Sequence, residues 1–357
     1  MVAAIDADMH LYETRGMWAE NSAGADRDRT LRIADDELGH AWLTLGDHRI
    51  QLAEVHHPGD VAAMGEYRRR VRAGRPALAS YDEALPVDFW DPAARVAKLD
   101  AWGLDGSVLF PNFGLLWERA LSADLETLRV NMAAWNRHAV AVAQQALGRL
   151  HPVGHLSLRG DLDWVHDQLA ALSAGGVRLA MVAPALVDGR PLSHPDLDAA
   201  WAMFVDSGVT PVFHVAAFPT RAFDDAWTAD DPDQTTPVLF ASFLWAAPAM
   251  AIADLAVHGV FERHPQLRLG VMELSAIWLP MFLRHLDRRL RLPQHLRRAA
   301  ADEARAAPQR LHPPPGPGRR LRRRDPRRAG PRHRRGDLHV LQRLSPRRGQ
   351  RPAAGTL

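Results

Sequence analysis

The alternation of short apolar runs with longer helical patterns is the feature that most constrains the fold of this chain. Predicted strands lie at Val2–Ile5, Gly106–Phe110, Leu150–Leu158, Val177–Ala183, Val209–Phe213 and Leu267–Met272. Predicted helices lie at Ala120–Leu147, Leu162–Leu172, Pro195–Asp206, Leu239–Phe261 and Ala276–Leu290. This order is typical of an α/β protein with a parallel sheet, and eight such units close a barrel in about 250 residues.

Two segments depart from this alternation. Residues 11–90 follow the first strand as an insertion, in which Trp42–Leu52 reads as a β-hairpin with Gly46 and Asp47 at its turn. Residues 301–357 hold 16 Arg, nine Pro, no Lys and no aromatic residue, which predicts a disordered basic tail. The tail has a net charge of +12 and residues 1–300 one of −10, so the pI near 9.5 reflects the tail. We therefore expect one barrel domain over residues 1–300 and a separate tail over residues 301–357.

Composition excludes several chemistries. Without cysteine the chain has no disulfide, no thiolate nucleophile and no cysteine-ligated metal. The longest uncharged apolar stretch, Val238–Ala253, is shorter than the roughly 20 residues of a membrane-spanning helix and contains Pro248. We see no secretory signal, and we expect a soluble cytoplasmic protein without a membrane partner.

Polar residues stand at the carboxyl ends of three predicted strands. The first strand ends in IDADMH, and residues two apart on a strand share a face, so Asp8 and His10 point the same way. His214 ends the fifth strand and Glu273 follows the sixth. These strand ends meet at the mouth of a parallel barrel, where barrel enzymes carry their sites. Two imidazoles and a carboxylate there can meet at one divalent ion.

Each of these residues also has a structural alternative. An Asp-rich strand end can form a turn or a helix cap. A single strand-end histidine such as His214 can be a satisfied core residue. Glu273 can stand at the N-terminus of the next helix, where the helix dipole favours an acid.

Several stretches together carry a family resemblance. In order along residues 1–290 they read IDADMHLYE, DPAARVAKLDAWGLDGSVLFPNFG, MAAWNRHAV, RPLSHPDLDAAW, GVTPVFH and GVFERHPQLRLGVMELSAIWLP. The chain thereby resembles the amidohydrolase-related (amidohydrolase 2) family. This branch of the metal-dependent TIM barrels includes aminocarboxymuconate semialdehyde decarboxylase.

The resemblance implies a role for each residue at the strand ends. The family's first strand usually reads D-x-H-x-H with both histidines on the metal, and here those positions are Asp8 and His10. An acid at the first position also occurs among the decarboxylase members. His214 matches the metal histidine of strand five. Glu273 takes the place of a histidine that often acts as general acid and base, which assigns it proton transfer.

The family's last metal residue, an aspartate in a phrase like S-D-Y-P-H on strand eight, is missing. Strands seven and eight are not recognisable, so the barrel is incomplete as written. One lysine against 43 arginines indicates a GC-rich gene, in which a one-base slip yields Arg, Pro, Ala and Gly. LHVLQRLSPRRG at 338–349, read one base later, can encode FMFSSDYPHVEG, and PQRLHPPPG at 308–316 can encode PSDYIRRQV. We infer a frameshift near residues 295–307 and expect the chain as written to have little metal binding or activity.

The resemblance thus implies a metal-dependent enzyme acting on a small, possibly aromatic, carboxylic acid or derivative. One divalent ion, zinc first and otherwise Mn, Fe or Co, would serve either hydrolysis or non-oxidative decarboxylation. Trp278, Phe113 and Trp117 are candidate contacts to a flat apolar substrate, and each could equally be a core residue. The resemblance also implies a homodimer, for which the apolar Val238–Ala253 segment is the candidate interface. The rival hypothesis is a non-catalytic, degraded barrel whose arginines bind nucleic acid non-specifically, although the tail lacks aromatic residues for base stacking.

Overall fold

The computed structural model describes residues 3–54, 69–71, 73–115, 117–146, 148–216 and 242–290. Within these ranges the chain divides into two units, residues 3–276 and residues 277–290. The predicted tail, its second reading frame and the boundary near residue 300 lie outside the described residues.

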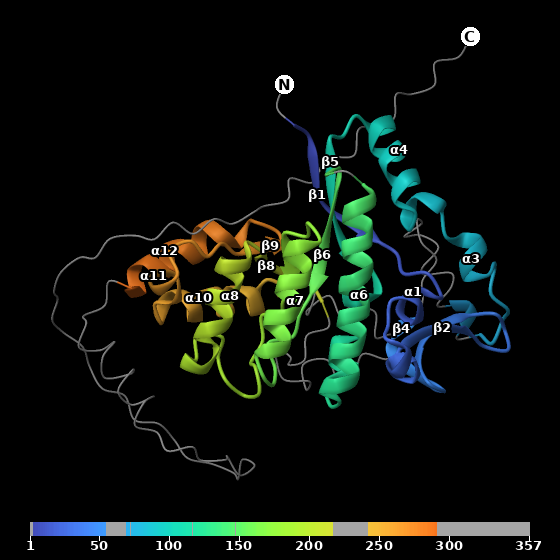
Figure 1. Cartoon of the computed structure of the whole chain (residues 1–357), viewed down its shortest axis with the longest axis horizontal. Helices are drawn as coiled ribbons and strands as arrows, with labels where there is room; N and C mark the ends of the chain where they lie inside the picture. The colour runs from blue at the N-terminus through green and yellow to red at the C-terminus, as the bar shows by residue number, and fades with distance from the viewer. Residues whose placement is uncertain are drawn as a thin grey trace. The chain divides into compact units, whose positions relative to one another are not determined.

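A six-stranded parallel sheet organises the first unit (Figure 1). Its strands are β1 (Ile5–Leu11), β5 (Gly106–Pro111), β6 (Leu150–His155), β7 (Leu179–Met181), β8 (Thr210–His214) and β9 (Gly270–Met272). They neighbour one another in that order, and every pairing is parallel. The (β/α) barrel architecture is thus present with six of its eight strands. Among the described residues, β1 and β9 each have a strand partner on one side only.

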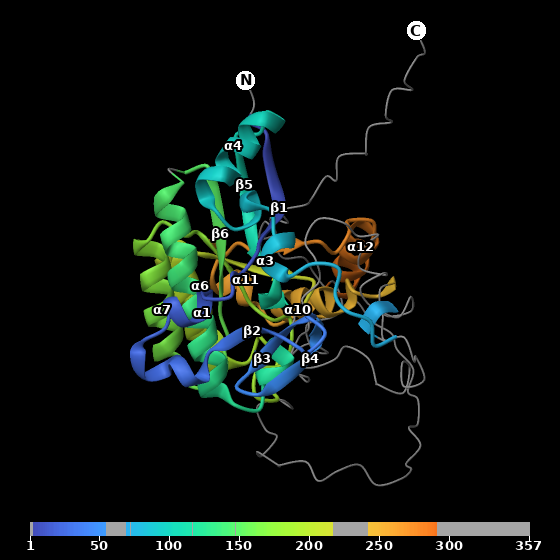
Figure 2. The ribbon, with the colours of Figure 1, turned by 90° about the vertical axis from the view of Figure 1, so that its right-hand side faces the viewer.

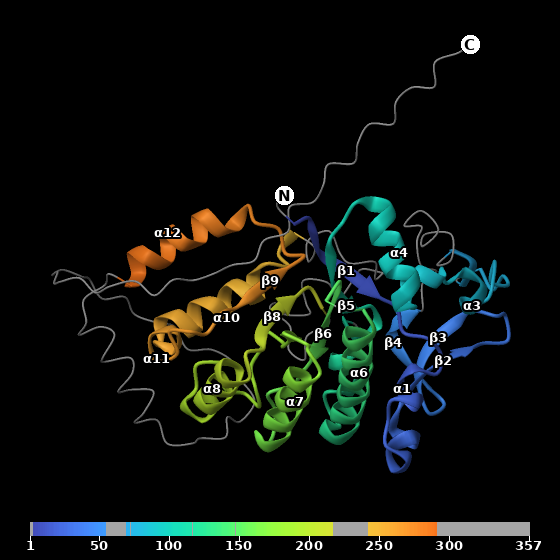
Figure 3. The same ribbon diagram turned by 45° about the horizontal axis from the view of Figure 1, so that its top comes forward.

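Helices connect these strands. They are α4 (Pro92–Trp102), α5 (Glu118–Leu121), α6 (Leu125–Gln145), α7 (Asp163–Ala174), α8 (Asp198–Ser207), α10 (Ala246–Val257) and α11 (Val260–Arg263). Four of them, α4, α6, α7 and α8, pack on the strands or on one another, and Figure 3 shows α6, α7 and α8 side by side along the sheet. The second unit is α12 (Trp278–Leu290). No helix in the described part of the chain is both long and apolar enough to cross a membrane.

Local sequence signals set the ends of these helices. Asp91 caps α4 by accepting a hydrogen bond from the N–H of Ala94 at 2.8 Å, and Gly103 ends it in the left-handed conformation with φ 69°. The predicted helix Ala120–Leu147 is two helices, because Asp124 caps α6 by accepting from the N–H of Thr127 at 3.1 Å.

The sheet interior is filled by apolar side chains, as in a barrel core. This cluster consists of Val108, Phe110, Leu115, Val153, Met181, Val212 and Met272. Each of β5, β6, β7, β8 and β9 contributes at least one residue to it, and on β8 the residue two positions beyond Val212 is His214.

The strand β6 is shorter than the predicted Leu150–Leu158. The amide of Asn136 on α6 accepts from the N–H of His155 at 2.7 Å and donates to its carbonyl at 3.1 Å. Both backbone groups of His155 are therefore bonded to a side chain, while β6 still pairs with β7 at His155 and Met181.

The insertion folds as a small sheet of its own. β2 (Leu31–Asp35), β3 (Ala41–Leu45) and β4 (His48–Glu54) are antiparallel in the order β2-β3-β4. The predicted hairpin is present as β3 and β4, and β2 was not predicted. Short helices accompany it: α1 (Met17–Glu20), η1 (Gly24–Arg29), α3 (Tyr81–Ala84) and η2 (Val87–Phe89). In Figure 2, α1 packs against α6 and β2, which fixes the insertion beside the barrel helices.

Candidate metal centre

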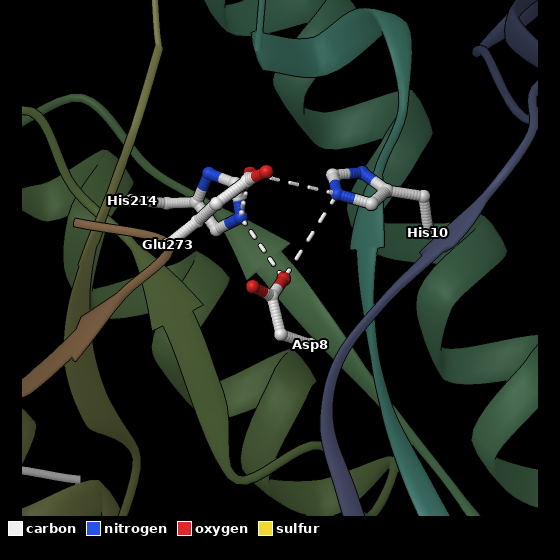
Figure 4. Close-up of side chains that lie close together, drawn as sticks. All are labelled: Asp8, His10, His214 and Glu273. Atoms are coloured by element: carbon white, nitrogen blue, oxygen red, sulfur yellow. Dashed lines mark hydrogen bonds and ion pairs between the residues drawn. The ribbon is translucent and has the colours of Figure 1, made fainter. Parts of the chain in front are cut away.

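The end of β1 supplies two of the polar side chains of the site. The pairing of β1 with β5 matches Asp6 with Ser107 and then Met9 with Leu109, so β1 contains one extra residue, a β-bulge, around Asp8. The N–H of Asp8 donates to the carboxylate of Asp6 at 3.0 Å instead of to the neighbouring strand. Asp8 and His10 both point into the site (Figure 4).

The ends of β8 and β9 supply the other two. His214 is the last residue of β8, and its Nδ1 donates to the carbonyl of Val215 at 2.8 Å. Glu273 follows β9 with a left-handed φ of 53°, and Ser275 has φ 58°. Residues other than glycine rarely adopt this conformation, and such strain clusters at functional sites.

Four side chains converge at this point, as Figure 4 shows. Asp8 Oδ1 lies 3.3 Å from His214 Nε2 and 3.9 Å from His10 Nε2. Glu273 Oε2 lies 3.5 Å from His214 Nε2 and 4.0 Å from His10 Nε2. One donor atom of each residue lies within 4.8 Å of all the others. Donors about 2.1 Å from one tetrahedral ion would lie about 3.4 Å apart, so the spacing is close to that of a ligand set.

The orientation of both imidazoles also fits a cation. The Nδ1 atoms of His214 and His10 face the carbonyls of Val215 (2.8 Å) and Pro111 (3.4 Å). A carbonyl only accepts, so each Nδ1 carries the proton and a neutral ring turns the lone pair of Nε2 toward the two carboxylates. Four electron-rich atoms facing one another are unfavourable unless a cation or protons lie between them.

The curvature of the sheet brings these strands together. Strands lie about 4.8 Å apart, so β1 and β8, four positions apart in the strand order, would be about 19 Å apart in a flat sheet. The contact between Asp8 and His214 therefore requires that the sheet close on itself as in a barrel.

The four side chains differ in exposure. The side chains of His214 and Asp8 are 0% and 1% exposed, whereas those of His10 and Glu273 are 23% and 41% exposed. The ring of Phe110 lies 4.2 Å from that of His214 and forms the apolar floor of the site. His10 and Glu273 are thus the solvent-accessible members of the cluster.

Comparison with known proteins identifies the fold. No family model and no curated protein sequence matches the chain. Among solved structures, an amidohydrolase from Mycobacterium avium subsp. paratuberculosis K-10 is 24% identical with a TM-score of 0.61, over 86% of this chain and 79% of that one. The fold is that of the amidohydrolase barrels.

Two further solved structures agree with this fold. IDCase from Metarhizium anisopliae is 15% identical with a TM-score of 0.53, over 86% of this chain and 73% of that one. A variant of 5-carboxyvanillate decarboxylase from Novosphingobium aromaticivorans DSM 12444, with bound manganese, is 18% identical with a TM-score of 0.50, over 85% and 72% of the two chains. At these identities the likeness establishes the amidohydrolase-barrel fold, and the activity must be argued from the site.

The three predicted substrate contacts do not join the four-residue cluster. Phe113 is 1% exposed and packs against the rings of Tyr12 and Tyr81. Trp117 is 0% exposed, with its ring 5.1 Å from that of His155. Trp278 begins α12, in the second unit. Their role in substrate binding remains a prediction, and for Phe113 and Trp117 the structure shows core packing.

Sequence reasoning missed two buried acids of this barrel. Glu118 on α5 pairs with His155 at the end of β6, with 3.2 Å between Oε2 and Nε2. His155 ends its strand as His214 does, so the same positional rule would have identified it. Glu13, three residues after His10, accepts from the N–H groups of Phe113 and Gly114 at about 3 Å. Burial raises the pKa of Glu13 to about 7, and these hydrogen bonds oppose the shift.

Proposed function

We propose that this chain is a metal-dependent enzyme of the amidohydrolase-related family that acts on a small carboxylic acid or a derivative of one. The observation that carries the proposal is the meeting of Asp8, His10, His214 and Glu273 at the carboxyl ends of three strands. The donor set of two imidazoles and two carboxylates suits a divalent ion.

The chain's own residues divide the work by their burial. Asp8 and His214, which are buried, would hold the ion, and His10 would complete the ligand set from the accessible side. When bound, the ion would polarise a substrate carboxylate or acidify a water molecule. Glu273, the most exposed member, would move a proton between its Oε2 and the reacting atom.

Between the two reactions, we favour non-oxidative decarboxylation over hydrolysis. The acid at the first ligand position, Asp8, supports this choice, as does the structural neighbour that is a decarboxylase of an aromatic acid. A panel of hydroxylated benzoic acids, including 5-carboxyvanillate, assayed for released CO2 tests it. Release of CO2 supports decarboxylation. A hydrolysed ester or amide without CO2 would assign hydrolysis instead.

We propose zinc as the ion, because imidazoles favour it, with Mn, Fe and Co as the alternatives. The neighbouring 5-carboxyvanillate decarboxylase holds manganese, which makes Mn²⁺ the first competitor. Metal analysis of the purified chain, followed by chelation and reloading with each ion in turn, decides between them by which ion restores turnover.

We also propose that the sequence is frameshifted upstream of Pro308. The six described strands of an eight-strand fold, together with the S-D-Y-P-H phrase permitted by the second frame, support this. Because Asp8, His10 and His214 remain as ligands while the strand-eight aspartate is missing, the chain as written would bind one ion much more weakly than the frame-restored chain. Resequencing codons 290–310 tests the frame directly. An unaltered reading there would contradict the frameshift. Equal metal affinity and stoichiometry in both chains would contradict the weaker binding expected of the chain as written.

We place the enzyme in the cytoplasm as a homodimer. Met250 and Val257 on α10 are 66% and 42% exposed, and such apolar side chains favour an interface on this helix. Light scattering of the wild type and of Met250→Glu tests the dimer, which we expect only in the wild type. Cell fractionation tests the location.

A further inference from the structure

A buried arginine lies beside the strand that carries two of the candidate ligands. Arg95 stands in the first half of α4 and is 4% exposed. It forms no ion pair with a carboxylate of the described residues. Burial lowers the pKa of Arg95, and the charges of Asp88, Tyr12 and Asp6 partly oppose that shift. Burying a guanidinium that forms no ion pair is costly in desolvation free energy. The hydrogen bonds that Arg95 forms must therefore offset that cost.

Those contacts are directed to the end of β1. The Nη2 of Arg95 donates to the carbonyl of His10 at 3.1 Å, and Nη1 faces the sulfur of Met9 at 3.6 Å. Its Nε donates to the carbonyl of Asp88. The ring of Phe89 lies under the guanidinium, 5.4 Å from its carbon. One side chain therefore fastens the backbone of a candidate metal ligand to the segment that precedes α4.

The β-bulge explains why β1 requires such a fastening. Regular pairing with β5 is interrupted between Asp6 and Met9, so the ladder does not fix the backbone of Asp8. Before the bulge, the carboxylate of Asp6 accepts a hydrogen bond from the N–H of Asp8 at 3.0 Å. After the bulge, the guanidinium of Arg95 donates a hydrogen bond to the carbonyl of His10. Pairing with β5 resumes at Met9 and includes His10, so Arg95 adds a side-chain contact to the first regular pairs of the ladder after the bulge.

We propose that Arg95 is a positioning residue that holds the bulged end of β1 so that Asp8 and His10 present their donors to the same ion. This inference rests on the proposed function, because it assumes that the four-residue cluster binds a metal. Arg95 itself does not touch the cluster; it acts through the backbone of His10.

Zinc titration calorimetry on the full chain, with thermal unfolding of each variant alongside, tests this role. We expect Arg95→Met to weaken Zn²⁺ binding by about ten- to a hundredfold, the usual effect of removing a group that orients a ligand. The matched control is Arg149→Met. Arg149 likewise donates to two backbone carbonyls, those of Asp105 at 2.6 Å and Leu104 at 2.9 Å, but just before β6, at the opposite end of the strands. We expect this control to lose stability without losing zinc affinity.

A double-mutant cycle separates positioning from general destabilisation. With His10 replaced by Ala, Arg95→Met should weaken zinc binding by a smaller factor than in the wild type, because one of the two ligands that it positions is gone. If Arg95→Met does not fold, Arg95→Lys serves instead. A lysine keeps the charge but cannot reach the carbonyls of His10 and Asp88 together, so weaker zinc binding is expected again.

The outcomes are distinguishable from failure of the proposed function. A wild-type chain that binds no zinc would overturn the proposed function and this inference with it. A wild type that binds zinc while the Arg95 variants bind it equally well would overturn the inference alone. Equal loss of affinity in Arg149→Met, or an undiminished effect of Arg95→Met without His10, would also overturn it.

Discussion

His214 Nε2 lies 3.3 Å from Asp8 Oδ1, although the two residues are 206 positions apart in the sequence. One ends β8 and the other lies in the bulge of β1, so their contact forms only when the sheet has closed far enough to bring its first and fifth strands together. Closure of the barrel and assembly of the site are therefore one structural event. An ion bound between His214 and Asp8 would stabilise the closed sheet as well as the site.

Asp8→Asn should abolish tight metal binding. The substitution keeps the size of the side chain but removes the buried negative charge that faces both imidazoles. Loss of a group that only supports a ligand weakens metal binding by about ten- to a hundredfold. Because Asp8 is a candidate ligand itself, we expect a larger loss of Zn²⁺ affinity. The rise in melting temperature on adding Zn²⁺, compared between the variant and the wild type, measures this loss of affinity. A rise equal to that of the wild type would show that Asp8 is not a ligand.

Glu273→Gln should separate binding from catalysis. If Glu273 transfers protons, the variant keeps the buried Asp8 and His214, binds Zn²⁺ nearly as the wild type does, and loses turnover by about 10²–10⁴-fold. Calorimetry and a CO2-release assay on the same preparation measure the two effects. Loss of the metal together with activity would instead make Glu273 a ligand.

Glu13→Gln should change the pH dependence of stability. Burial raises the pKa of the folded carboxyl from 4.5 to about 7, so the folded state binds the proton more tightly than the unfolded chain. The wild type should therefore lose stability as the pH rises from about 4.5 to 7, by up to about 3 kcal/mol, with no further loss above. The glutamine variant lacks this titratable group, so its free energy of unfolding should rise relative to that of the wild type over the same pH range.

Urea denaturation at several pH values measures the difference for Glu13. The exposed Glu37→Gln is the control and should run parallel to the wild type throughout. Parallel curves for Glu13→Gln and the wild type would contradict a raised pKa in the folded state.

Gly154→Ala should destabilise the fold by about 1–3 kcal/mol through overpacking. A Cβ at residue 154 would lie 2.7 Å from Leu172 Cδ1 and 3.2 Å from the side-chain oxygen of Asn136. That oxygen accepts from the N–H of His155, the last residue of β6. Gly24→Ala has no atom within 4 Å of its added Cβ and serves as the control. Chemical denaturation that showed equal stabilities for both variants would argue against the tight packing at β6.

The sequence allowed the barrel and the four-residue cluster to be predicted for the same reason. Parallel strands carry short apolar runs, and the polar residue that ends each run must lie at one edge of the sheet. Asp8, His10, His214 and Glu273 could be singled out in this way before their distances were known. Their roles as ligands and proton donor remain predictions.

Other features have no local signal in the sequence. The bulge at Asp8 depends on pairing with β5, about 100 residues away, and Arg95 occupies a helix where arginine is ordinarily exposed. The burial of Phe113 and Trp117 depends on how the segment after β5 folds back onto Tyr81 and His155. A pattern of residue types cannot distinguish an aromatic side chain in a substrate pocket from one in the core.

Titration of the chelator-treated full chain with Zn²⁺, beside the double variant Asp8→Asn/His214→Asn, tests the central claim most directly. The claim is that Asp8, His10 and His214, at the ends of β1 and β8, hold one divalent ion beside Glu273. We predict one ion per chain for the wild type and none for the double variant. No binding by the wild type, or the same binding by both proteins, would contradict it.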